Sequence, residues 1–417
     1  MKLAYFAHDL ADAAIHRRVR LLSRSADITL LGFRRTAEPV QVVSGLQAVD
    51  LGRTFDAKLV RRVSSVARAA LDVGTWQKHV EGADVVMARQ LEMLALAALA
   101  RRRVAPRAAL VYECLDIHRL MIGRGSISAG LRSLERRLLR GCDLLAVSSP
   151  AFVSEYFASP NFSPNPAACP PSVLVENKVL ASEVPPGEAA HRNNGPPIIG
   201  PPWRIGWFGV IRCRRSLHLL SALCLALPGQ VEVVIRGRVS QNVIPDFDAV
   251  VAASPGMSFL GSYNRHTDLS AIYRAVHFNW VMDFYETPGN SDWLLPNRLY
   301  EGSIYGAVPI ALASVESGRW LARHGYDILL NEPLEETLPT AFRGLGAATY
   351  LEARRKLGGI AQADLVQDDT DVTGGFAAVL AELNSGRNGD LSAPGNRRAK
   401  LSAGRFEEPP RYSGTAA

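Results

Sequence analysis

The sequence predicts an α/β fold in which two doubly wound, mainly parallel sheets form separate domains. Three observations carry this prediction. Short apolar runs that suit buried strands alternate with segments of helical periodicity along most of the chain. A stretch rich in Pro, Gly and Asn at 182–202 interrupts this alternation near the middle. The alternation then restarts at 203–209 with a strand that ends in glycine.

Length and composition agree with a globular protein. The chain has 417 residues, of which 47% are hydrophobic and 21% charged. No apolar run approaches the roughly 18–20 residues that a membrane span needs, and the first apolar segment turns polar at His8 and Asp9, too early for a secretion signal. We therefore expect a cytoplasmic protein with an N-terminal domain at 1–181, a linker at 182–202, a C-terminal domain at 203–384 and a disordered tail at 385–417.

Cysteine spacing and charge exclude several classes of protein. The five cysteines are scattered and lack CxxC spacing, which argues against a disulfide framework or a zinc site and favours buried free thiols. The formal charge is +7, but only six of the 47 basic residues are lysines, and no zinc finger, RNP pattern or Lys-rich tail is present. We therefore expect no nucleic-acid partner. A surface that faces anionic lipid, or a lipid-diphosphate substrate, explains the positive charge equally well.

The first half of the chain alternates strands and helices in a regular order. The expected strands lie at 3–7, 28–33, 85–88 and 109–113, and the expected helices at 13–23, 58–71 and 91–101. In the first helix Ile15, Val19 and Leu22 form an apolar stripe. Arg17, Arg18 and Arg20 are expected to face water.

Two polar side chains follow the strand at 109–113. They are Asp116 and His118. Because ligands of open parallel sheets bind at the carboxyl ends of the strands, these residues are our candidates for catalysis and for holding an acceptor. The alternative is that they only cap the turn into the next element.

The segment 133–145 is a helix with a basic face. The arginines on that face are Arg132, Arg136, Arg137 and Arg140. Such a face is usually only solvated. The sharper alternative is a peripheral contact with the cytoplasmic membrane.

The strand at 203–209 carries the clearest sign of an anion site in the second half. A glycine at its end, Gly209, allows a diphosphate to approach the backbone, and the arginines Arg212 and Arg215 follow. Arginine suits phosphate because its guanidinium is always charged and can bind in a bidentate manner. The alternative is a basic helix start that lies away from any ligand.

The stretch 295–311 reads as a helix at 297–305, a left-handed cap at Gly306 and a short buried strand at 308–311. One acid, Glu301, lies in the middle of the helix. From the residues alone, this is an amphipathic helix with a solvated glutamate that leads into a core strand.

This stretch resembles the donor-binding segment of retaining GT-B glycosyltransferases of the family 4-like type, which build bacterial exopolysaccharides such as succinoglycan. The likeness rests on the helix with its glutamate, followed by a small residue, Gly, a small residue and Val-Pro-Ile-Ala. It extends over about 130–315, including the "apolar, Phe, apolar, Gly" strand at 257–261. The resemblance implies two Rossmann-like domains facing a central cleft. It also implies hexose transfer from a nucleotide-diphosphate sugar, with UDP-glucose favoured, to a lipid-linked oligosaccharide, with retained configuration and without a metal or other cofactor.

The resemblance also implies roles for individual residues. Glu301 is expected to hold the ribose hydroxyls of the donor. The donor-binding positions that accompany it are Gly209, Arg212, Arg215, Asp292, Asn297 and Arg298. Related enzymes carry a second glutamate eight positions before the ribose-binding one, where this chain has Trp293. The acids and amides of the loop 283–296 are therefore candidates to contact the sugar: Asp283, Glu286, Asn290 and Asp292.

Two other classes of protein remain compatible with these patterns. A sugar-nucleotide epimerase has the same two-domain architecture, but needs no acceptor. A non-catalytic relative that acts as a partner subunit is the other, because the second glutamate is missing.

Overall fold

The structure, a computed structural model, describes residues 1–54, 59–163, 169–185, 198–369 and 375–389. Contacts divide the chain into two compact units. The first unit contains residues 1–116, 123–175 and the C-terminal segment from residue 370. The second contains residues 117–122 and 176–369.

The first unit is built on a mainly parallel sheet. Its strand order is β3-β4-β2-β1-β5-β6-β7-β8; the β3–β4 pair is antiparallel and the pairs from β4 to β8 are parallel. The strands are β1 (Lys2–Ala7), β2 (Asp27–Arg34), β3 (Val42–Val43), β4 (Leu46–Arg53), β5 (Val85–Arg89), β6 (Ala109–Cys114), β7 (Leu144–Val147) and β8 (Ser172–Leu174). The carboxyl ends of the parallel strands thus lie along one edge.

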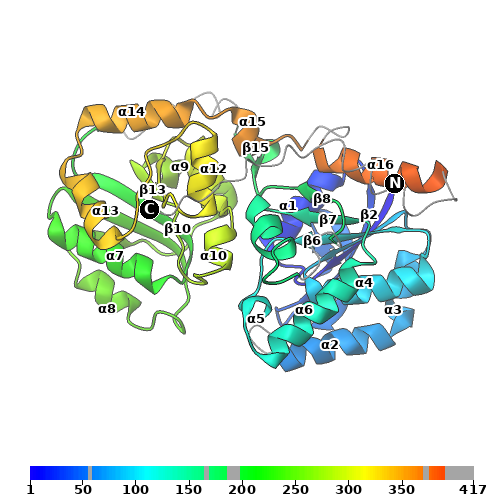
Figure 1. The fold of residues 1–417 in the computed structure, drawn as a ribbon. Coiled ribbons are helices and arrows are strands. Elements are labelled where there is room, and N and C mark those ends of the chain that lie inside the picture. The colour runs from blue at the N-terminus through cyan, green and yellow to red at the C-terminus, as the bar shows by residue number, and fades with distance from the viewer. Residues whose placement is uncertain (55–58, 164–168, 186–197, 370–374, 390–417) are drawn as a thin grey trace. The chain divides into compact units, whose positions relative to one another are not determined.

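Helices cover both faces of this sheet. On one face, α1 (Ala13–Leu22) and α16 (Gly375–Gly389) contribute Val19 and Leu380 to a core that contains Tyr5 of β1. The other face is covered by α2 (Leu59–Leu71), α3 (Val73–Val80), α4 (Leu91–Val104) and α6 (Ser126–Leu139), which gather on one side in Figure 1. The first unit is therefore doubly wound, as the alternation predicts.

The second unit has a parallel sheet of its own, in the order β12-β11-β10-β13-β14. The strands are β10 (Trp203–Ile211), β11 (Val231–Val239), β12 (Met257–Phe259), β13 (Phe278–Trp280) and β14 (Val308–Ile310). The chain adds β11 and β12 on one side of β10, and β13 and β14 on the other. The order of strands therefore reverses between β10 and β13, which is where open α/β sheets bind ligands.

The helices of the second unit include the segment that carries Glu301. They are α7 (Arg214–Ala226), α8 (Phe247–Ala252), α9 (Arg265–Arg274), α10 (Asn290–Trp293), α11 (Asn297–Ile304), α12 (Glu316–Arg323), α13 (Leu334–Arg343) and α14 (Ala347–Gly358). The helix, cap and strand expected at 295–311 are present as α11, Gly306 with a φ of 80°, and β14. The inner face of α11 is buried and carries Leu299, Tyr300 and Ile304.

The division by contacts places two segments differently from the expected domain boundaries. Residues 117–122 group with the second unit. Helix α16 groups with the first unit, because Phe376, Leu380 and Leu383 are buried in its core. Periodicity indicates that a helix has an apolar face, but not which core covers it. Of the expected tail, residues 385–389 complete α16, and 390–417 lie outside the described residues, as does 186–197 of the expected linker.

Three further observations concern the described residues as a whole. The cysteines are free thiols, and Cys114, Cys142, Cys213 and Cys224 are buried. No cluster of His, Cys, Asp or Glu in these residues is arranged to hold a metal ion. None of the helices in this part of the chain combines the length and apolar character of a membrane span.

Candidate functional site

The carboxyl end of β10 leaves a stretch of backbone open. Gly209 has a φ of 111°, and a Cβ built on it would meet no atom within 4 Å. Its partner in register on β11 is Gly237, where a Cβ would overlap the carbonyl oxygen of Gly209. Because Gly237 has no side chain, β11 can approach β10 closely at this point. On its other side, the backbone of Gly209 is accessible.

A cysteine connects the start of α7 to the loop after β13. Cys213 is the N-cap of α7, and its Sγ accepts hydrogen bonds from the backbone N–H of Ser216 (3.4 Å) and its hydroxyl (3.1 Å). The same sulfur accepts the N–H of Phe284 at 3.3 Å. The turn after β10 and the loop after β13 are thereby held together where the strand order reverses.

The expected phosphate ligand Arg212 lies in this turn. Its Nη2 is 3.7 Å from Oδ2 of Asp283, and its guanidinium lies 4.8 Å from the ring centroid of Tyr285. A distance of 3.7 Å is an ion pair but longer than a hydrogen bond. Since 38% of the Arg212 side chain is exposed, the guanidinium remains accessible.

Arg215, the second expected phosphate ligand, is already paired with acids. It donates two hydrogen bonds to Glu332, at 2.9 and 2.8 Å, and a longer one to Glu335 at 3.3 Å. The hydrogen bonds to Glu332 raise the pKa of Arg215. Phosphate binding by Arg215 would have to displace these carboxylates.

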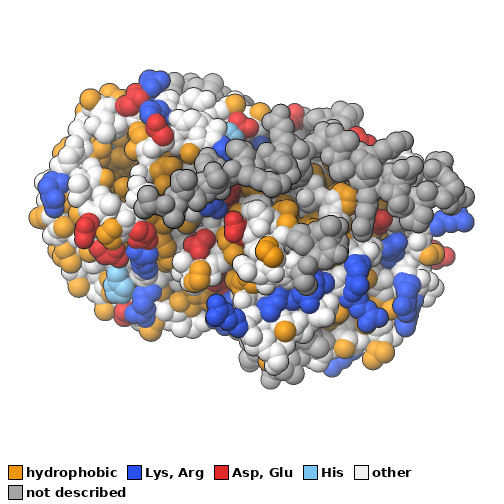
Figure 2. Space-filling model, in the orientation of Figure 1, with side chains coloured by type: hydrophobic (Ala, Val, Ile, Leu, Met, Phe, Trp, Pro, Cys, Tyr) orange, Lys and Arg blue, Asp and Glu red, His pale blue; other side chains and the backbone are white. Residues whose placement is uncertain are grey.

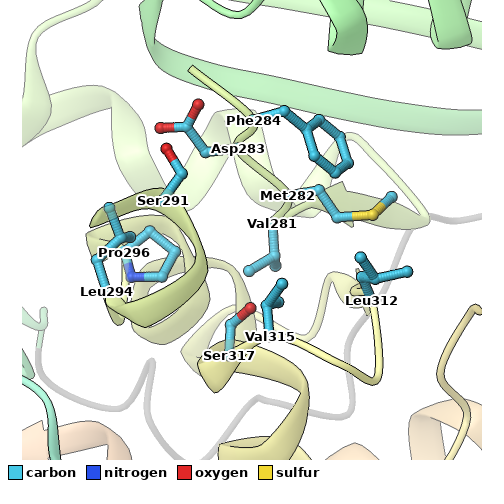
Figure 3. Close-up of a pocket in the computed structure, with 10 residues that line it drawn as sticks. All are labelled: Val281, Met282, Asp283, Phe284, Ser291, Leu294, Pro296, Leu312, Val315 and Ser317. Carbon is cyan, nitrogen blue, oxygen red and sulfur yellow. The ribbon is translucent and has the colours of Figure 1, made fainter. Parts of the chain in front are cut away.

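A pocket lies beside this turn, at the carboxyl ends of β13 and β14 (Figure 3). Its lining is mostly apolar and comes from the loop after β13, from α10 and from the start of α12. The residues are Val281, Met282, Asp283, Phe284, Ser291, Leu294, Pro296, Leu312, Val315 and Ser317. Figure 3 shows Asp283 and Ser291 on one side of the pocket, and the hydroxyl of Ser291 accepts the N–H of Glu286 at 2.9 Å. Its free volume is about 10 Å³, which is room for about one water molecule, so a larger ligand would have to lie at its mouth.

The other polar residues of the loop 283–296 hold its shape. Asp292 accepts hydrogen bonds from the hydroxyl of Thr287 (2.9 Å) and the N–H of Gly289 (3.0 Å). Asn290 accepts the N–H of Ile117 at 2.9 Å. The structure thus places the expected sugar ligand Asp292 in contacts within its own loop.

Arg298 supports the wall of the pocket from behind. It donates to the carbonyl oxygens of Val281 (3.1 Å) and Met282 (3.0 Å), both of which belong to lining residues. Its own carbonyl accepts a hydrogen bond from Asn279 at 2.6 Å. Asn297, the first residue of α11, is exposed.

Glu301 is buried and paired with an arginine that the sequence did not indicate. Only 5% of Glu301 is exposed, and its Oε1 lies 2.9 Å from Nε of Arg265. Arg265 also binds Glu183 at 2.9 Å. Burial alone would lower the pKa of Arg265, but Glu301 and Glu183 outweigh it and raise that pKa. Burial, reinforced by Glu301, also raises the pKa of Tyr263 to about 12. The expected ribose ligand is therefore a buried acid that is paired with Arg265, and it does not line the pocket.

Asp116 and His118 follow the carboxyl end of β6. Both residues are exposed, and Nδ1 of His118 accepts the N–H of Leu120 at 3.2 Å. Each is therefore reachable by a ligand. Asp116 belongs to the first unit and His118 to the second.

The first unit also contains a buried charge network that sequence reasoning missed. The carboxylate of Glu113 accepts hydrogen bonds from Tyr5 (2.6 Å), Arg18 (2.6 Å) and Arg89 (2.7 Å). Burial would raise the pKa of Glu113, but Arg89 and Arg18 outweigh it and hold the pKa at about 2. The expectation that Arg17 and Arg18 face water was wrong, because they are 8% and 5% exposed. The spacing gave one sign of this burial: Arg18 lies about one turn after Ile15, and therefore on the buried side of α1.

Five of the seven expected donor residues form two groups, while Asp292 holds its own loop and Asn297 is exposed at the start of α11. Gly209, Arg212 and Arg298 lie at or behind the pocket edge where the strand order reverses. By contrast, Arg215 and Glu301 are held by charged partners of their own.

Comparison with known proteins identifies one relative of nearly the same length. The succinoglycan biosynthesis protein ExoL of Rhizobium meliloti (strain 1021) is 40% identical over 375 residues, which cover 89% of this chain and 91% of ExoL. No family model matches the sequence.

Solved structures share the fold at low sequence identity. HepE from Anabaena, in complex with UDP, is 14% identical with a TM-score of 0.62, over 93% of this chain and 100% of HepE. Sucrose-phosphate synthase from Thermosynechococcus elongatus is 13% identical with a TM-score of 0.62, over 93% and 98%. WaaG, a glycosyltransferase involved in lipopolysaccharide biosynthesis, is 12% identical with a TM-score of 0.57, over 93% and 100%.

These likenesses confirm the expected α/β fold of two Rossmann-like domains. The identity to ExoL extends over almost the whole of both chains, and the protein therefore belongs to the family of the succinoglycan biosynthesis protein ExoL and has the GT-B glycosyltransferase fold.

Proposed function

We propose that the protein is a glycosyltransferase of succinoglycan-type exopolysaccharide synthesis, which transfers glucose from UDP-glucose to a lipid-linked oligosaccharide with retention of configuration. The observation that carries the proposal is the open backbone at Gly209, next to the accessible Arg212 and the pocket that contains Asp283. Family membership supports the pathway. UDP as the donor base is supported by HepE, which has the same fold and whose structures include complexes with UDP and UDP-glucose.

The chemistry proposed for this site is stabilisation of the departing diphosphate. Arg212 and the N-terminal end of α7 supply positive charge where negative charge develops. In a retaining reaction of this type, a phosphate oxygen of the leaving group accepts the proton of the incoming hydroxyl. Asp116 or His118 then serves to orient the acceptor rather than to act as an essential base.

A lipid-linked acceptor requires the protein to work at a membrane surface, and we propose a peripheral contact through α6. Arg137 and Arg140 are exposed on this helix, and the apolar side chains of Ile127 and Leu134 are 63% and 43% exposed. Figure 2 shows Lys and Arg side chains gathered over the region of α4 and α6. Basic residues next to exposed apolar side chains suit the interface of an anionic bilayer. Sedimentation with vesicles of anionic lipid tests this contact, and equal binding to neutral vesicles would contradict it.

The transfer itself is tested by incubating the protein with radiolabelled UDP-glucose and membrane lipids from an exopolysaccharide-producing cell. We expect label in the lipid fraction, release of UDP, and an α-linked product by nuclear magnetic resonance. A β-linked product would overturn the retaining mechanism.

A non-catalytic partner subunit is the second candidate. It is favoured by two ion pairs, Glu301 with Arg265 and Arg215 with Glu332, because Glu301 and Arg215 were expected to bind the donor. In the same assay it predicts neither release of UDP nor labelled lipid. A sugar-nucleotide epimerase predicts a changed sugar and free UDP without lipid.

A further inference from the structure

We propose that Asp283 is the acid that binds the hydroxyls of the donor sugar, and that Arg212 exchanges Asp283 for the diphosphate when the donor binds. This inference rests on the proposed function, and it identifies the sugar-binding residue of that site. It follows from the position of Asp283, from its unused hydrogen-bonding capacity and from the roles of the other polar residues in the loop.

Asp283 is the acid that lines the pocket among the described residues. Its Oδ1 accepts the N–H of Tyr285 at 3.0 Å, which fixes the carboxylate. Its Oδ2 faces Arg212 at 3.7 Å without a hydrogen bond, and the side chain is 10% exposed. A carboxylate can accept several hydrogen bonds, so Oδ2 retains capacity to accept hydroxyl protons.

The surroundings of Asp283 suit a sugar. The hydroxyl of Ser291 lies on the same side of the pocket (Figure 3), and Val281, Leu294 and Leu312 provide an apolar surface for C–H groups. Since the pocket itself has room for only about one water molecule, the sugar ring would lie at its mouth beside Asp283, with its C–H groups towards the apolar lining.

The other candidates in this loop are engaged in holding it. Both oxygens of Asp292 accept hydrogen bonds from Thr287 and Gly289, and Asn290 accepts one from Ile117. Glu286 and Asp292 are not among the residues that line the pocket. The structure therefore favours Asp283 over Asp292.

The contact between Arg212 and Asp283 links the sugar to the diphosphate. A partly exposed ion pair is weak, so the more highly charged diphosphate can bind Arg212 in place of Asp283. Asp283 then loses its cationic neighbour, and the sugar hydroxyls take the place of Arg212. Without a sugar, however, Asp283 competes with the diphosphate for Arg212 and repels it.

This exchange predicts opposite effects of one substitution on two ligands. In Asp283→Asn, we expect affinity for UDP-glucose to fall about ten- to a hundredfold, as for loss of hydrogen bonds to a charged group. Affinity for UDP should stay the same or rise by up to about fivefold, because a weak competing ion pair is removed. Isothermal titration with UDP and UDP-glucose measures both constants on the full chain.

Two further variants make the test specific. Glu352→Gln removes an acid that pairs with an arginine, Arg355 at 2.7 Å, on α14 and outside the pocket lining, and it should leave both affinities unchanged. Asp292→Asn should weaken both ligands alike, because it loosens the loop. The proposal is overturned if Asp283→Asn weakens UDP and UDP-glucose equally, or if the selective loss appears in Asp292→Asn instead. Failure of the wild-type protein to bind either ligand would overturn the proposed function together with this inference.

Discussion

The buried acid Glu135 leads to a prediction about how stability depends on pH. Glu135 lies on α6 and is 4% exposed, and it accepts hydrogen bonds from Tyr112 (3.1 Å) and Tyr156 (2.7 Å). Burial raises its pKa to about 7, against smaller lowering effects of the two tyrosines and Arg136. The perturbation we propose is Glu135→Gln, which keeps the size of the side chain and removes the titrating group.

The magnitude follows from the difference between the folded and unfolded pKa values. The ordinary pKa of glutamate is 4.5. Between pH 4.5 and 7 the folded protein therefore retains a proton that the unfolded chain has lost, and stability falls as pH rises through this range. Above pH 7 the full loss is about 3 kcal/mol. Glu135→Gln should abolish this loss, and so stabilise the protein more at pH 8 than at pH 5.

Urea unfolding at pH 5, 6, 7 and 8, followed by circular dichroism, gives the free energy of unfolding of both proteins. We expect the difference between variant and wild type to increase from pH 5 to pH 7 and then to remain constant. Glu155→Gln, which removes an exposed acid of the same unit, is the control for loss of a carboxylate. A difference that is the same at pH 5 and pH 8 would refute the reasoning.

Three other substitutions test other parts of the structure. Glu301→Gln should weaken UDP binding, and it should cost at most about 3 kcal/mol of stability because Arg265 loses one of its two acidic partners and keeps Glu183. Calorimetry and urea unfolding measure the two effects separately, and unchanged UDP affinity would contradict a role for Glu301 at the ribose. Glu113→Gln should destabilise the first unit by about 3–5 kcal/mol at pH 7. This deficit should shrink as pH falls from 4.5 towards 2, where wild-type Glu113 also becomes protonated; a deficit independent of pH would count against the network. Gly237→Ala should lower the melting temperature and abolish UDP binding, because its Cβ overlaps the carbonyl oxygen of Gly209; a variant that melts and binds like wild type would show that the strands can separate freely.

The sequence indicates the fold well because strands and helices are local features. The alternation of apolar runs and amphipathic segments predicted both sheets, and the segment from α11 to β14 lies where its periodicity places it. The hairpin of β3 and β4 was missed, although Ser44 and Gly45, with φ of 49° and 84°, form the two-residue turn that such a dipeptide favours. A short strand pair of this kind gives only a weak apolar pattern.

The site was harder to predict because its charges pair over long separations in sequence. Arg18 and Glu113 are 95 residues apart, and Arg265 and Glu301 are 36 apart. A single sequence shows that these residues are charged, but not which of them meet in a core. Asp283 and Asp292 likewise look equivalent in the loop, and only the hydrogen bonds of Asp292 and the lining of the pocket distinguish them.

The central claim is that the second unit binds a nucleotide-sugar at the carboxyl ends of β10 and β13. The most direct test is thermal unfolding of the purified protein with UDP, GDP, ADP, CDP and the corresponding sugar nucleotides. A ligand that binds only the folded state adds about 2.7 kcal/mol of stability at a hundred times its dissociation constant. We predict a selective rise in melting temperature with UDP and UDP-glucose. A melting temperature that none of these ligands changes would contradict the claim and favour a non-catalytic partner subunit.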